Sequence, residues 1–501
     1  MSFPYKEKEK AKEFILSLFE RLKQNVPIRK SWEKINQLFL IHFTDPELYL
    51  FLDTRGEKVE LSFGELEGEN PEHFFLDNPV WRRPLIRLGD GIFFCAMPQV
   101  FFSFVFQILD GLLGEDTKPR KCCSTRRAEF LEAEVARILV KALPGCKYVR
   151  NFKWHDLEGE FETDIVVKDG SFLLIVEAKS GDISPPALRG APGRIARHIR
   201  EQVVEPAIQS QQLAERVIEE RDKAGRNSPS CLRLPFPVED VRRILRLTVT
   251  LEFFAAIQSS FSVLRDTGFV NEEFPASPTM TLADLETVLD ILPSRAERLH
   301  YLMRRNELEK TIRLWGDELD LLGLYLETGL NLGKAEVNEM NLKLMHMSKT
   351  VDEYDNARDA GIERKRPILK KTKWWGDILQ ELERRAPARW LEAAVMLLNF
   401  PVDEQHQTER AFRRLKKNVK KNWIRYGTVN TVVMCAPEWR SDAVVLLAFR
   451  ERQKEKRYIF MENIAGSVLG SENHVERCLV IGVNIDRPRY PYNLLGVFDR
   501  H

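Results

Sequence analysis

The feature that most constrains this chain is an apolar run that leads directly into a charged triplet. The run Phe172–Val176 is typical of a buried strand, and Glu177-Ala178-Lys179 follows it without a break. Because side chains alternate between the two faces of a strand, Glu177 and Lys179 project from one face and Ala178 from the other. Uncompensated charge in a sheet interior is costly, so the sequence predicts that these two charges meet partners there.

The residues before this strand supply a partner. A second strand candidate, Asp164–Val167, is joined to the first by the turn signal Lys168-Asp169-Gly170. A hairpin through this turn brings Asp164 beside Glu177. The alternative is an exposed edge hairpin with an ordinary cross-strand salt bridge, worth about 0.2–1 kcal/mol. The apolar run favours the buried cluster.

Such a cluster has the chemistry of a metal site. Two carboxylates and a backbone carbonyl form a hard oxygen site suited to Mg²⁺ or Mn²⁺, so we expect Asp164, Glu177 and the carbonyl of Ala178 as ligands. The bound ion polarises a phosphoryl oxygen and lowers the pKa of a bound water. Lys179 orients or deprotonates that water, or offsets charge in the transition state, and the sequence leaves these roles open.

The pattern resembles the PD-(D/E)xK nuclease superfamily, which has the restriction-endonuclease-like fold. Asp164, Glu177 and Lys179 fall on its three motif positions, and Thr163 stands where the superfamily has its proline. The layout Glu162-Thr163-Asp164, strand, Glu177-Ala178-Lys179 is similar to the nuclease-related-domain (NERD-like) group. The resemblance covers residues 121–305 and implies an αβββαβ core that hydrolyses phosphodiester bonds with Mg²⁺, in DNA and as an endonuclease.

The resemblance also implies a further acid on the helix before the strands. Apolar residues at helical spacing predict that helix over 126–143. Glu132 and Glu134 flank its apolar stripe while Glu129 points away, and Glu132 is expected as the accessory catalytic acid.

A loop over 181–193 precedes a long helix that reaches about residue 220 and carries Gln209 and Gln212. In related nucleases a glutamine here often supports the metal site. An ordinary solvated helix face is the alternative for either residue.

Two basic segments are candidates for nucleic-acid contact. Near the expected site, the arginines that could bind phosphates are Arg189, Arg194, Arg197 and Arg200. Far along the chain, the predicted helix 409–425 has a buried stripe of Phe412, Leu415, Val419 and Trp423 and faces its basic residues outward, among them Lys416, Lys417, Lys420 and Lys421. A nucleic-acid surface and a plain solvated helix face are equally good interpretations of that helix.

Other patterns define the expected domains. Short strands predicted at 38–43, 49–52 and 87–95, after an opening helix at 5–22, indicate an N-terminal α/β domain over 1–120 that ends in a linker at Lys118-Pro119. The nuclease-like domain follows over 121–305, then a helical region over 306–425. Four apolar runs, at 431–434, 443–449, 479–485 and 494–498, predict a small C-terminal α/β domain over 426–501.

Composition and the absence of some motifs exclude several classes of protein. Lys plus Arg number 76 and Asp plus Glu 75, so any attraction to nucleic acid must come from local patches. Seven scattered cysteines indicate neither a disulfide framework nor a zinc cluster. Walker, GxGxxG, HExxH and GxSxG motifs are absent from the sequence.

The N-terminal residues lack the apolar segment of a secretory signal. Polar residues interrupt the apolar stretch 92–113, which favours a buried strand and helix over a membrane span. We therefore expect a soluble, cytoplasmic protein that binds nucleic acid and no membrane, with homo-oligomers and partner proteins left open. The rival hypothesis is a catalytically silent nuclease-fold module that binds nucleic acid or a partner protein. Retention of all three motif residues argues against it.

Overall fold

The computed structural model describes residues 40–42, 86–89, 92–94 and 117–500, with short gaps at 157–158, 189–190, 225–231, 255–257, 259–260, 310, 338–339, 422, 424–429, 436, 438, 472 and 488. The chain divides into two compact units, residues 1–134 with 180–202 and residues 135–179 with 203–501. The predicted opening helix at 5–22 and strand at 49–52 lie outside the described residues. The domain boundaries expected from the sequence stay a prediction.

The first unit contains a small antiparallel sheet. Its strands lie in the order β1 (Leu40–His42), β3 (Ile92–Phe94), β2 (Ile86–Gly89). The strands predicted at 38–43 and 87–95 are confirmed over these residues.

The helices of the first unit include the start of α7 (Thr117–Ala142), α8 (Pro185–Leu188) and α9 (Pro192–Ile199). The linker predicted at Lys118-Pro119 is wrong, because both residues lie in the first turn of α7. Proline is tolerated in a first helical turn, where its missing N–H has no intrahelical partner to lose.

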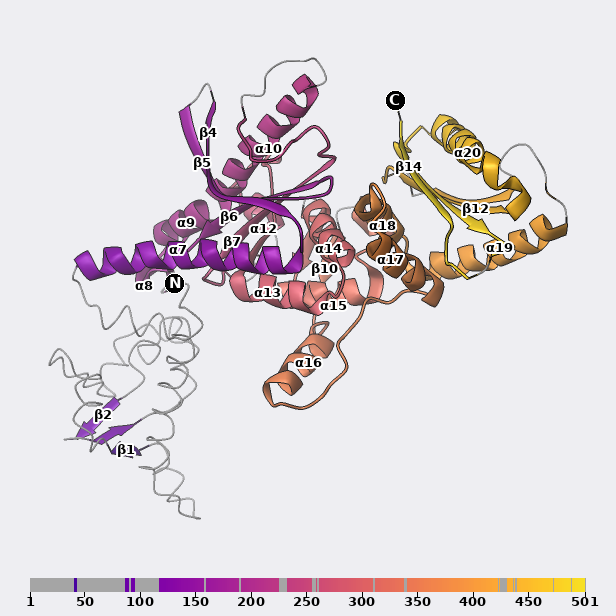
Figure 1. The fold of residues 1–501 in the computed structure, drawn as a ribbon. Coiled ribbons are helices and arrows are strands. Elements are labelled where there is room, and N and C mark those ends of the chain that lie inside the picture. Colours follow the sequence, from indigo (N-terminus) through magenta and orange to yellow (C-terminus); the bar gives the residue numbers. More distant parts are fainter. Residues whose placement is uncertain are drawn as a thin grey trace, which may run out of the picture. The chain divides into compact units, whose positions relative to one another are not determined.

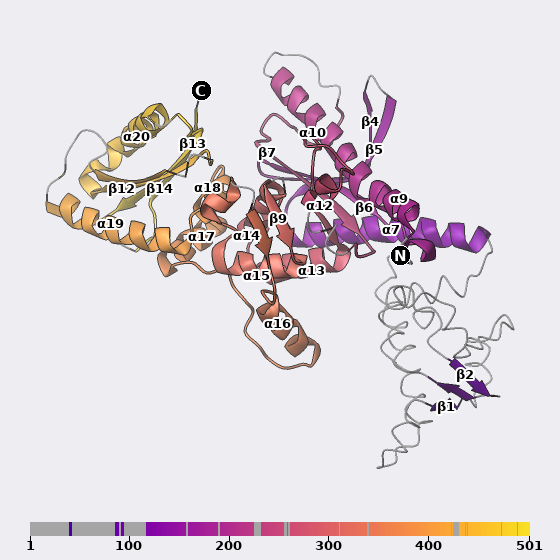
Figure 2. The ribbon, with the colours of Figure 1, turned by 180° about the vertical axis from the view of Figure 1, so that it is seen from behind.

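The second unit begins with the end of α7 and a five-stranded sheet in the order β4-β5-β6-β7-β8. The strands are β4 (Lys147–Asp156), β5 (Gly159–Asp169), β6 (Phe172–Lys179), β7 (Arg243–Thr250) and β8 (Thr279–Thr281). β4, β5 and β6 pair antiparallel, whereas β7 and β8 continue the sheet parallel to β6. The β4–β5 hairpin extends past the other strands as an arm (Figures 1 and 2).

One face of this sheet packs on α10 (Glu205–Ala224), which follows α9 through a π-helical segment, Arg200–Val204. Leu173 and Ile175 of β6 and Val166 of β5 share a buried core with Leu213 of α10. The opposite face is buried as well, since Phe172 to Glu177 are all buried and β7 also contacts α13 and α14. A sheet covered on both faces explains why β6 is a continuous apolar run rather than an alternating one.

The segment between the two larger sheets is mostly helical. Its helices are α13 (Leu282–Ile291), α14 (Arg295–Leu308), α15 (Glu318–Thr328), α16 (Lys349–Asp359), α17 (Lys373–Arg385) and α18 (Trp390–Leu398). A short helix, α12 (Phe261–Asp266), lies between β7 and β8 in the chain. The region predicted as helical over 306–425 also holds two short parallel strands, β9 (Ile312–Trp315) and β10 (Met340–Lys343).

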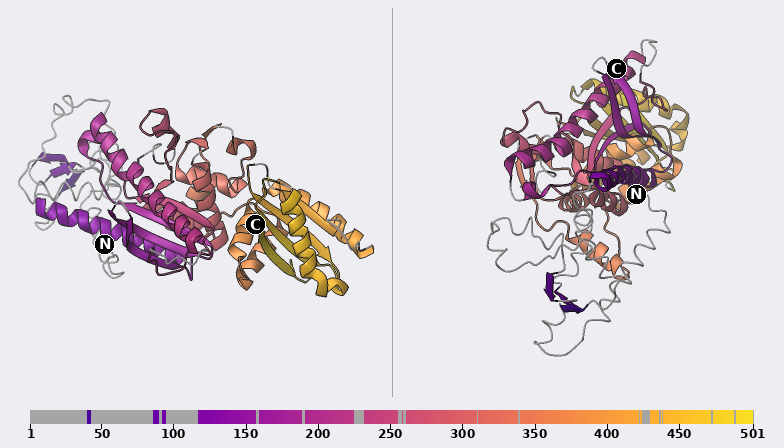
Figure 3. Two further views of the ribbon diagram at one scale, coloured as in Figure 1. Left: turned by 90° about the horizontal axis from the view of Figure 1, so that it is seen from above. Right: turned by 90° about the vertical axis from the view of Figure 1, so that its left-hand side faces the viewer.

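The C-terminal sheet has the order β11-β12-β13-β14. Its elements are α19 (Val402–Lys421), β11 (Thr431–Cys435), β12 (Asp442–Phe449), α20 (Arg457–Ser471), β13 (Arg477–Asn484) and β14 (Leu494–Asp499). All four predicted apolar runs are strands. Every residue of β12 is buried, so both faces of that strand are covered, one by α20 and the other by α18 and α19 (Figure 3).

Among the described helices, none combines the length and the apolar character that a membrane crossing requires. Residues 95–113 of the apolar stretch lie outside the described residues. The mixed α/β class expected from the sequence is confirmed.

Candidate active site

The candidate site lies where two neighbouring strands separate. The β5–β6 ladder ends at the pair Ile165 and Val176. Beyond it, Glu177, Ala178 and Lys179 pair only with β7, while β5 continues along β4. The edge of β6 that faces β5 is therefore open at the charged triplet.

The Asp164 side chain lies at this open edge of β6. Its Oδ2 accepts a hydrogen bond of 2.7 Å from the backbone N–H of Ala178, replacing the carbonyl that a continued ladder would supply. The Lys179 carbonyl points the other way, toward β7, because it accepts from Leu251 N at 3.4 Å. Backbone groups alternate in direction along a strand, so the Ala178 carbonyl points toward β5 and Asp164.

The side chains of Asp164, Glu177 and Lys179 lie on the same face of the sheet. Val166 and Ile175 are paired across the strands and both belong to the core under α10. Counting by two along β6 puts Glu177 and Lys179 on this α10 face. Asp164 reaches the same face, because its Oδ2 lies 3.8 Å from Lys179 Nζ. The structure thus brings together the three residues that the sequence predicted to converge.

The ammonium group of Lys179 lies between several oxygens. Its Nζ is 3.1 Å from Glu177 Oε2, 3.1 Å from Gln209 Oε1 and 3.8 Å from Asp164 Oδ2. Gln209 extends from α10, so this helix contributes directly to the cluster. Gln209 is exposed on α10 and its side chain accepts from Lys179, and support of a metal site by this glutamine stays a prediction.

Glu177 is the most buried member of the cluster, with only 1% of its surface exposed. Burial raises its pKa to about 8; Lys179 lowers this pKa and Asp164 raises it, and the two do not offset the burial. Its second oxygen, Oε1, is buried and has no hydrogen-bond partner within the described part of the chain. A buried carboxylate oxygen without a partner is costly unless something else comes to it.

These residues fit a hard divalent cation. Asp164 and Glu177 supply carboxylate oxygens, the unpartnered Glu177 Oε1 among them, and the Ala178 carbonyl faces the same opening. No group of three His, Cys, Asp or Glu side chains suited to a metal occurs among the residues that the structure describes. A set of two carboxylates and one carbonyl suits Mg²⁺, which retains several waters, better than a metal that demands a complete protein cage.

A groove of about 220 Å³ adjoins this cluster. Its lining comes from the β4–β5 arm and from α10: Trp154, Glu160, Phe161, Glu162, Thr163, Gln209 and Gln212. This groove could not be predicted from the sequence, because the residues that line it come from segments far apart in the chain. Only the alternation of Phe161 and Thr163 with charged residues marks that part of β5 as two-sided.

Comparison with known proteins gives partial likenesses only. No family model matches the chain, and a search of curated proteins finds no match. The small subunit (R.BspD6I2) of the heterodimeric restriction endonuclease R.BspD6I is similar at 15% identity and a TM-score of 0.15, over 32% of this chain and 66% of that chain. Protein VC1899 from Vibrio cholerae is similar at 11% identity and a TM-score of 0.15, over 50% of this chain and 58% of that chain. The functional argument therefore depends on the chain's own residues.

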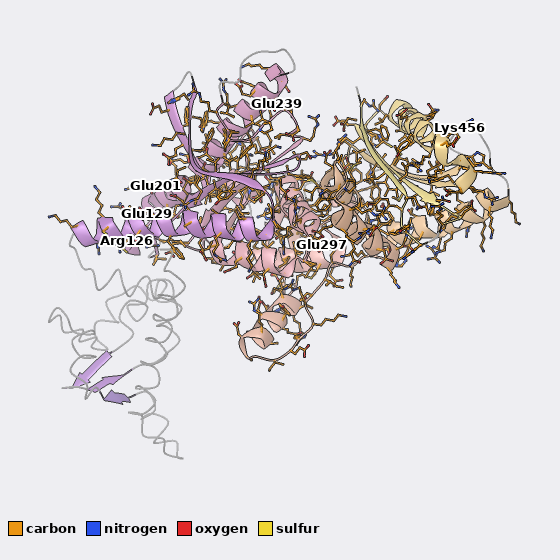
Figure 4. The ribbon with its side chains drawn as sticks, viewed as in Figure 1. Arg126, Glu129, Glu201, Glu239, Glu297 and Lys456 are labelled. Atoms are coloured by element: carbon orange, nitrogen blue, oxygen red, sulfur yellow. The ribbon has the colours of Figure 1, made fainter. Side chains whose placement is uncertain are left out.

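The three acids weighed on α7 differ in exposure. Glu129 is exposed (Figure 4), Glu132 is half-buried and Glu134 is buried. All three lie in the unit of residues 1–134 and 180–202, whereas Asp164, Glu177 and Lys179 lie in the other unit. The role expected for Glu132 stays a prediction.

The arginines expected near the site also belong to the first unit, and Arg189 is outside the described residues. Arg194, Arg197 and Arg200 are exposed on α9 and the π-helical segment. Arg197 pairs with Glu201 at 2.7 Å, so part of its charge is already neutralised. Their contact with phosphates stays a prediction.

The lysines of α19 do not join the Asp164–Glu177–Lys179 cluster, because α19 packs on β11 and β12 of the C-terminal sheet. Lys417, Lys420 and Lys421 are exposed, whereas Lys416 is half-buried with Nζ 5.2 Å from the centre of the Phe412 ring. Burial and the nearby Arg413 lower the pKa of Lys416. The buried stripe expected on this helix is present at Phe412 and Val419.

Proposed function

We propose that this chain is a metal-dependent nuclease that hydrolyses phosphodiester bonds in DNA, as an endonuclease. The observation that carries the proposal is the convergence of Asp164, Glu177 and Lys179 at an open strand edge, with Glu177 Oε1 buried and without a described partner. DNA is proposed as the substrate because of the motif resemblance. Mg²⁺ or Mn²⁺ is the proposed cofactor.

Asp164, Glu177 and the Ala178 carbonyl would hold the ion, which supplies Lewis-acid polarisation of the phosphoryl oxygen and a water of lowered pKa. Asp164 also has a structural role, because the hydrogen bond that its Oδ2 accepts from Ala178 N holds the end of β6 in place. Glu177, as the carboxylate that a bound cation would stabilise, would supply the oxygen Oε1 that has no partner among the described residues.

Lys179 is the proposed catalytic lysine. Glu177 and Gln209 hold its ammonium group on the α10 face, with only about a quarter of the side chain exposed. A positive charge fixed in a partly dry site stabilises the negative charge that develops on a phosphoryl group more strongly than the same charge in water. Glu132 is the proposed accessory acid.

Binding of the DNA backbone is assigned to Arg194, Arg197 and Arg200 and to the exposed basic side of α19. In the described part of the chain, Lys417 and Lys421 form no ion pair with a carboxylate. Many other surface cations are paired, such as Arg358 with Asp290 and Arg384 with Glu381. Unpaired basic side chains along one helix are available to neutralise phosphates.

The test compares wild type with Asp164→Asn and Lys179→Ala on plasmid and linear DNA, with RNA as a second substrate, in Mg²⁺ or Mn²⁺. Glu219→Gln, which changes a surface acid on α10, is the matched control. We expect cleavage by wild type and the control, and loss of about a hundredfold or more in the two site variants. Equal cleavage by all four proteins removes the assignment.

Calorimetry with Mg²⁺ separates this proposal from a catalytically silent module. A nuclease site binds the ion in a manner that depends on Asp164, whereas a silent module has no need of the ion. Absence of Asp164-dependent binding, together with intact DNA binding and no cleavage, is the result that favours the module.

A further inference from the structure

The groove beside the cluster has one flat aromatic side. Trp154 and Phe161 stack with ring centroids 4.7 Å apart and an interplanar angle of 20°, across the β4–β5 arm. Trp154 Nε1 donates to Thr163 Oγ1 at 3.3 Å, which fixes the indole at the base of the groove. Phe161 is half-buried and leaves part of its surface toward the groove.

The facing side is polar. Gln209 and Gln212 come from α10, three residues apart and so on one face of that helix. Gln209 already accepts from Lys179, whereas the Gln212 side chain is half-buried and makes no hydrogen bond within the described residues. Glu160 and Glu162 stand at the rim and are substantially exposed.

Two links join the groove to the proposed catalytic centre. Gln209 lines the groove and also contacts Lys179 Nζ, and Thr163 lines it one residue before Asp164. If the phosphate of one nucleotide lies at Asp164 and Glu177, the next nucleotide of the same DNA strand therefore lies at the groove.

The chemistry of the lining selects the occupant. None of the residues that line the groove is basic, and Glu162 and Glu160 already lie 3.7 Å from Lys153 and His155, so the groove has no cation in its lining to hold a backbone phosphate. At about 220 Å³ it is smaller than the usual pocket of a drug-sized ligand, which measures roughly 300–1,000 Å³. A flat aromatic side and a side-chain amide that both donates and accepts together match a single planar base that carries amino hydrogens.

We propose that this groove binds one unstacked nucleobase next to the phosphate that is cleaved, with preference for a base that bears an exocyclic amino group. The inference rests on the proposed nuclease function and adds a specificity site to it. The base packs against Phe161, and the Gln212 amide exchanges hydrogen bonds with its edge. The side-chain oxygen of Gln212 accepts from the amino group. Thymine, which has no amino group, is disfavoured.

The first experiment measures binding without cleavage. Short single-stranded oligonucleotides that each carry one abasic position, moved step by step along the strand, are titrated with protein in EDTA. We expect one position at which loss of the base weakens wild-type binding about tenfold, the effect of one stacked base. Gln212→Leu removes most of this position dependence, and Gln211→Leu retains it. Gln211 is on the same helix but pairs with Glu215 outside the groove.

The second experiment measures cleavage of strands that differ only at that position. Wild type is expected to cleave adenine or cytosine strands about tenfold faster than thymine strands. Gln212→Leu is expected to cleave all of them at similar rates, and Phe161→Leu to weaken binding of all of them.

The outcomes distinguish the two proposals. A flat abasic profile, or a base preference that Gln212→Leu leaves unchanged, overturns the groove assignment even if DNA is cleaved. A single Gln212-dependent position without any cleavage supports the groove and overturns the nuclease function.

Discussion

Replacement of Glu177 by glutamine is expected to stabilise the metal-free protein while it abolishes metal binding. Burial raises the pKa of Glu177 to about 8, against an ordinary value of 4.5. The unfolded chain releases this proton near its ordinary pKa, and the folded chain retains it until about pH 8. The free energy of unfolding therefore falls as the pH rises between these two values.

The magnitude follows from the shift. At 1.36 kcal/mol per pKa unit, the raised pKa lowers the free energy of unfolding by about 3 kcal/mol at neutral pH and by about 5 kcal/mol well above pH 8, relative to low pH. Below the ordinary pKa the cost is absent, because both states are protonated. Glutamine has nearly the same shape and no charge to bury, and Lys179 retains Gln209 and Asp164 as neighbours.

The assay is urea unfolding in EDTA at about pH 5 and about pH 8 for wild type, Glu177→Gln and the surface control Glu219→Gln. The free energy of unfolding of Glu177→Gln should exceed that of wild type by several kcal/mol at the higher pH and by under about 1 kcal/mol at the lower. Mg²⁺ added at the higher pH should raise the wild-type midpoint and leave the variant unchanged. A variant that is less stable than wild type at both pH values refutes the reasoning, and so does a gain that does not depend on pH.

Two further predictions concern the surroundings of the site. Gln209→Leu removes an acceptor from Lys179 Nζ, so DNA cleavage should fall about tenfold while the Mg²⁺ affinity measured by calorimetry stays unchanged. An equal loss of cleavage and of Mg²⁺ affinity would show that Gln209 is merely structural. Gln211→Leu is the control. Reversal of Lys417, Lys420 and Lys421 to Glu should weaken DNA binding for all sequences and reduce the slope of log affinity against log salt by about three. An unchanged slope would show that α19 is an ordinary solvated helix face, and Arg384→Glu, which alters a paired surface arginine, serves as the control.

The parts of the fold that depend on neighbours in sequence could be predicted. The helix predicted over 126–143 is one case, since its apolar residues recur at helical spacing and Leu131, Val135 and Leu139 of α7 are buried. The β11–β14 strands are another, because each is an apolar run between turns. The first turns of α7 were missed because the residues from Thr117 to Thr125 have no apolar repeat to mark a helix. Strands β9 and β10 were missed because each has only four residues and finds its partner far along the chain.

The same distinction holds within the site. Alternation along one strand predicted that Glu177 and Lys179 share a face, and the turn before Phe172 predicted their meeting with Asp164. Nothing in the sequence marks Ile165 and Val176 as the last pair of the β5–β6 ladder. The ladder ends there because the part of β5 before Ile165 pairs with β4 alone. The place of Gln209 depends on the rotation of α10 after the π-helical segment, and no local pattern specifies that rotation.

The charge count of the cluster bears on whether it is structural or catalytic. Asp164 and Glu177 can carry two negative charges, and Lys179 supplies one positive charge. A structural ion pair would be expected to balance its charges and to satisfy its buried oxygens, because a buried charge without a partner is destabilising. Here one oxygen of Glu177 has no partner in the described chain, and full ionisation leaves one negative charge in excess. A divalent cation at that oxygen would offset the excess charge and stabilise the ionised form of Glu177, as the proposed metal site predicts.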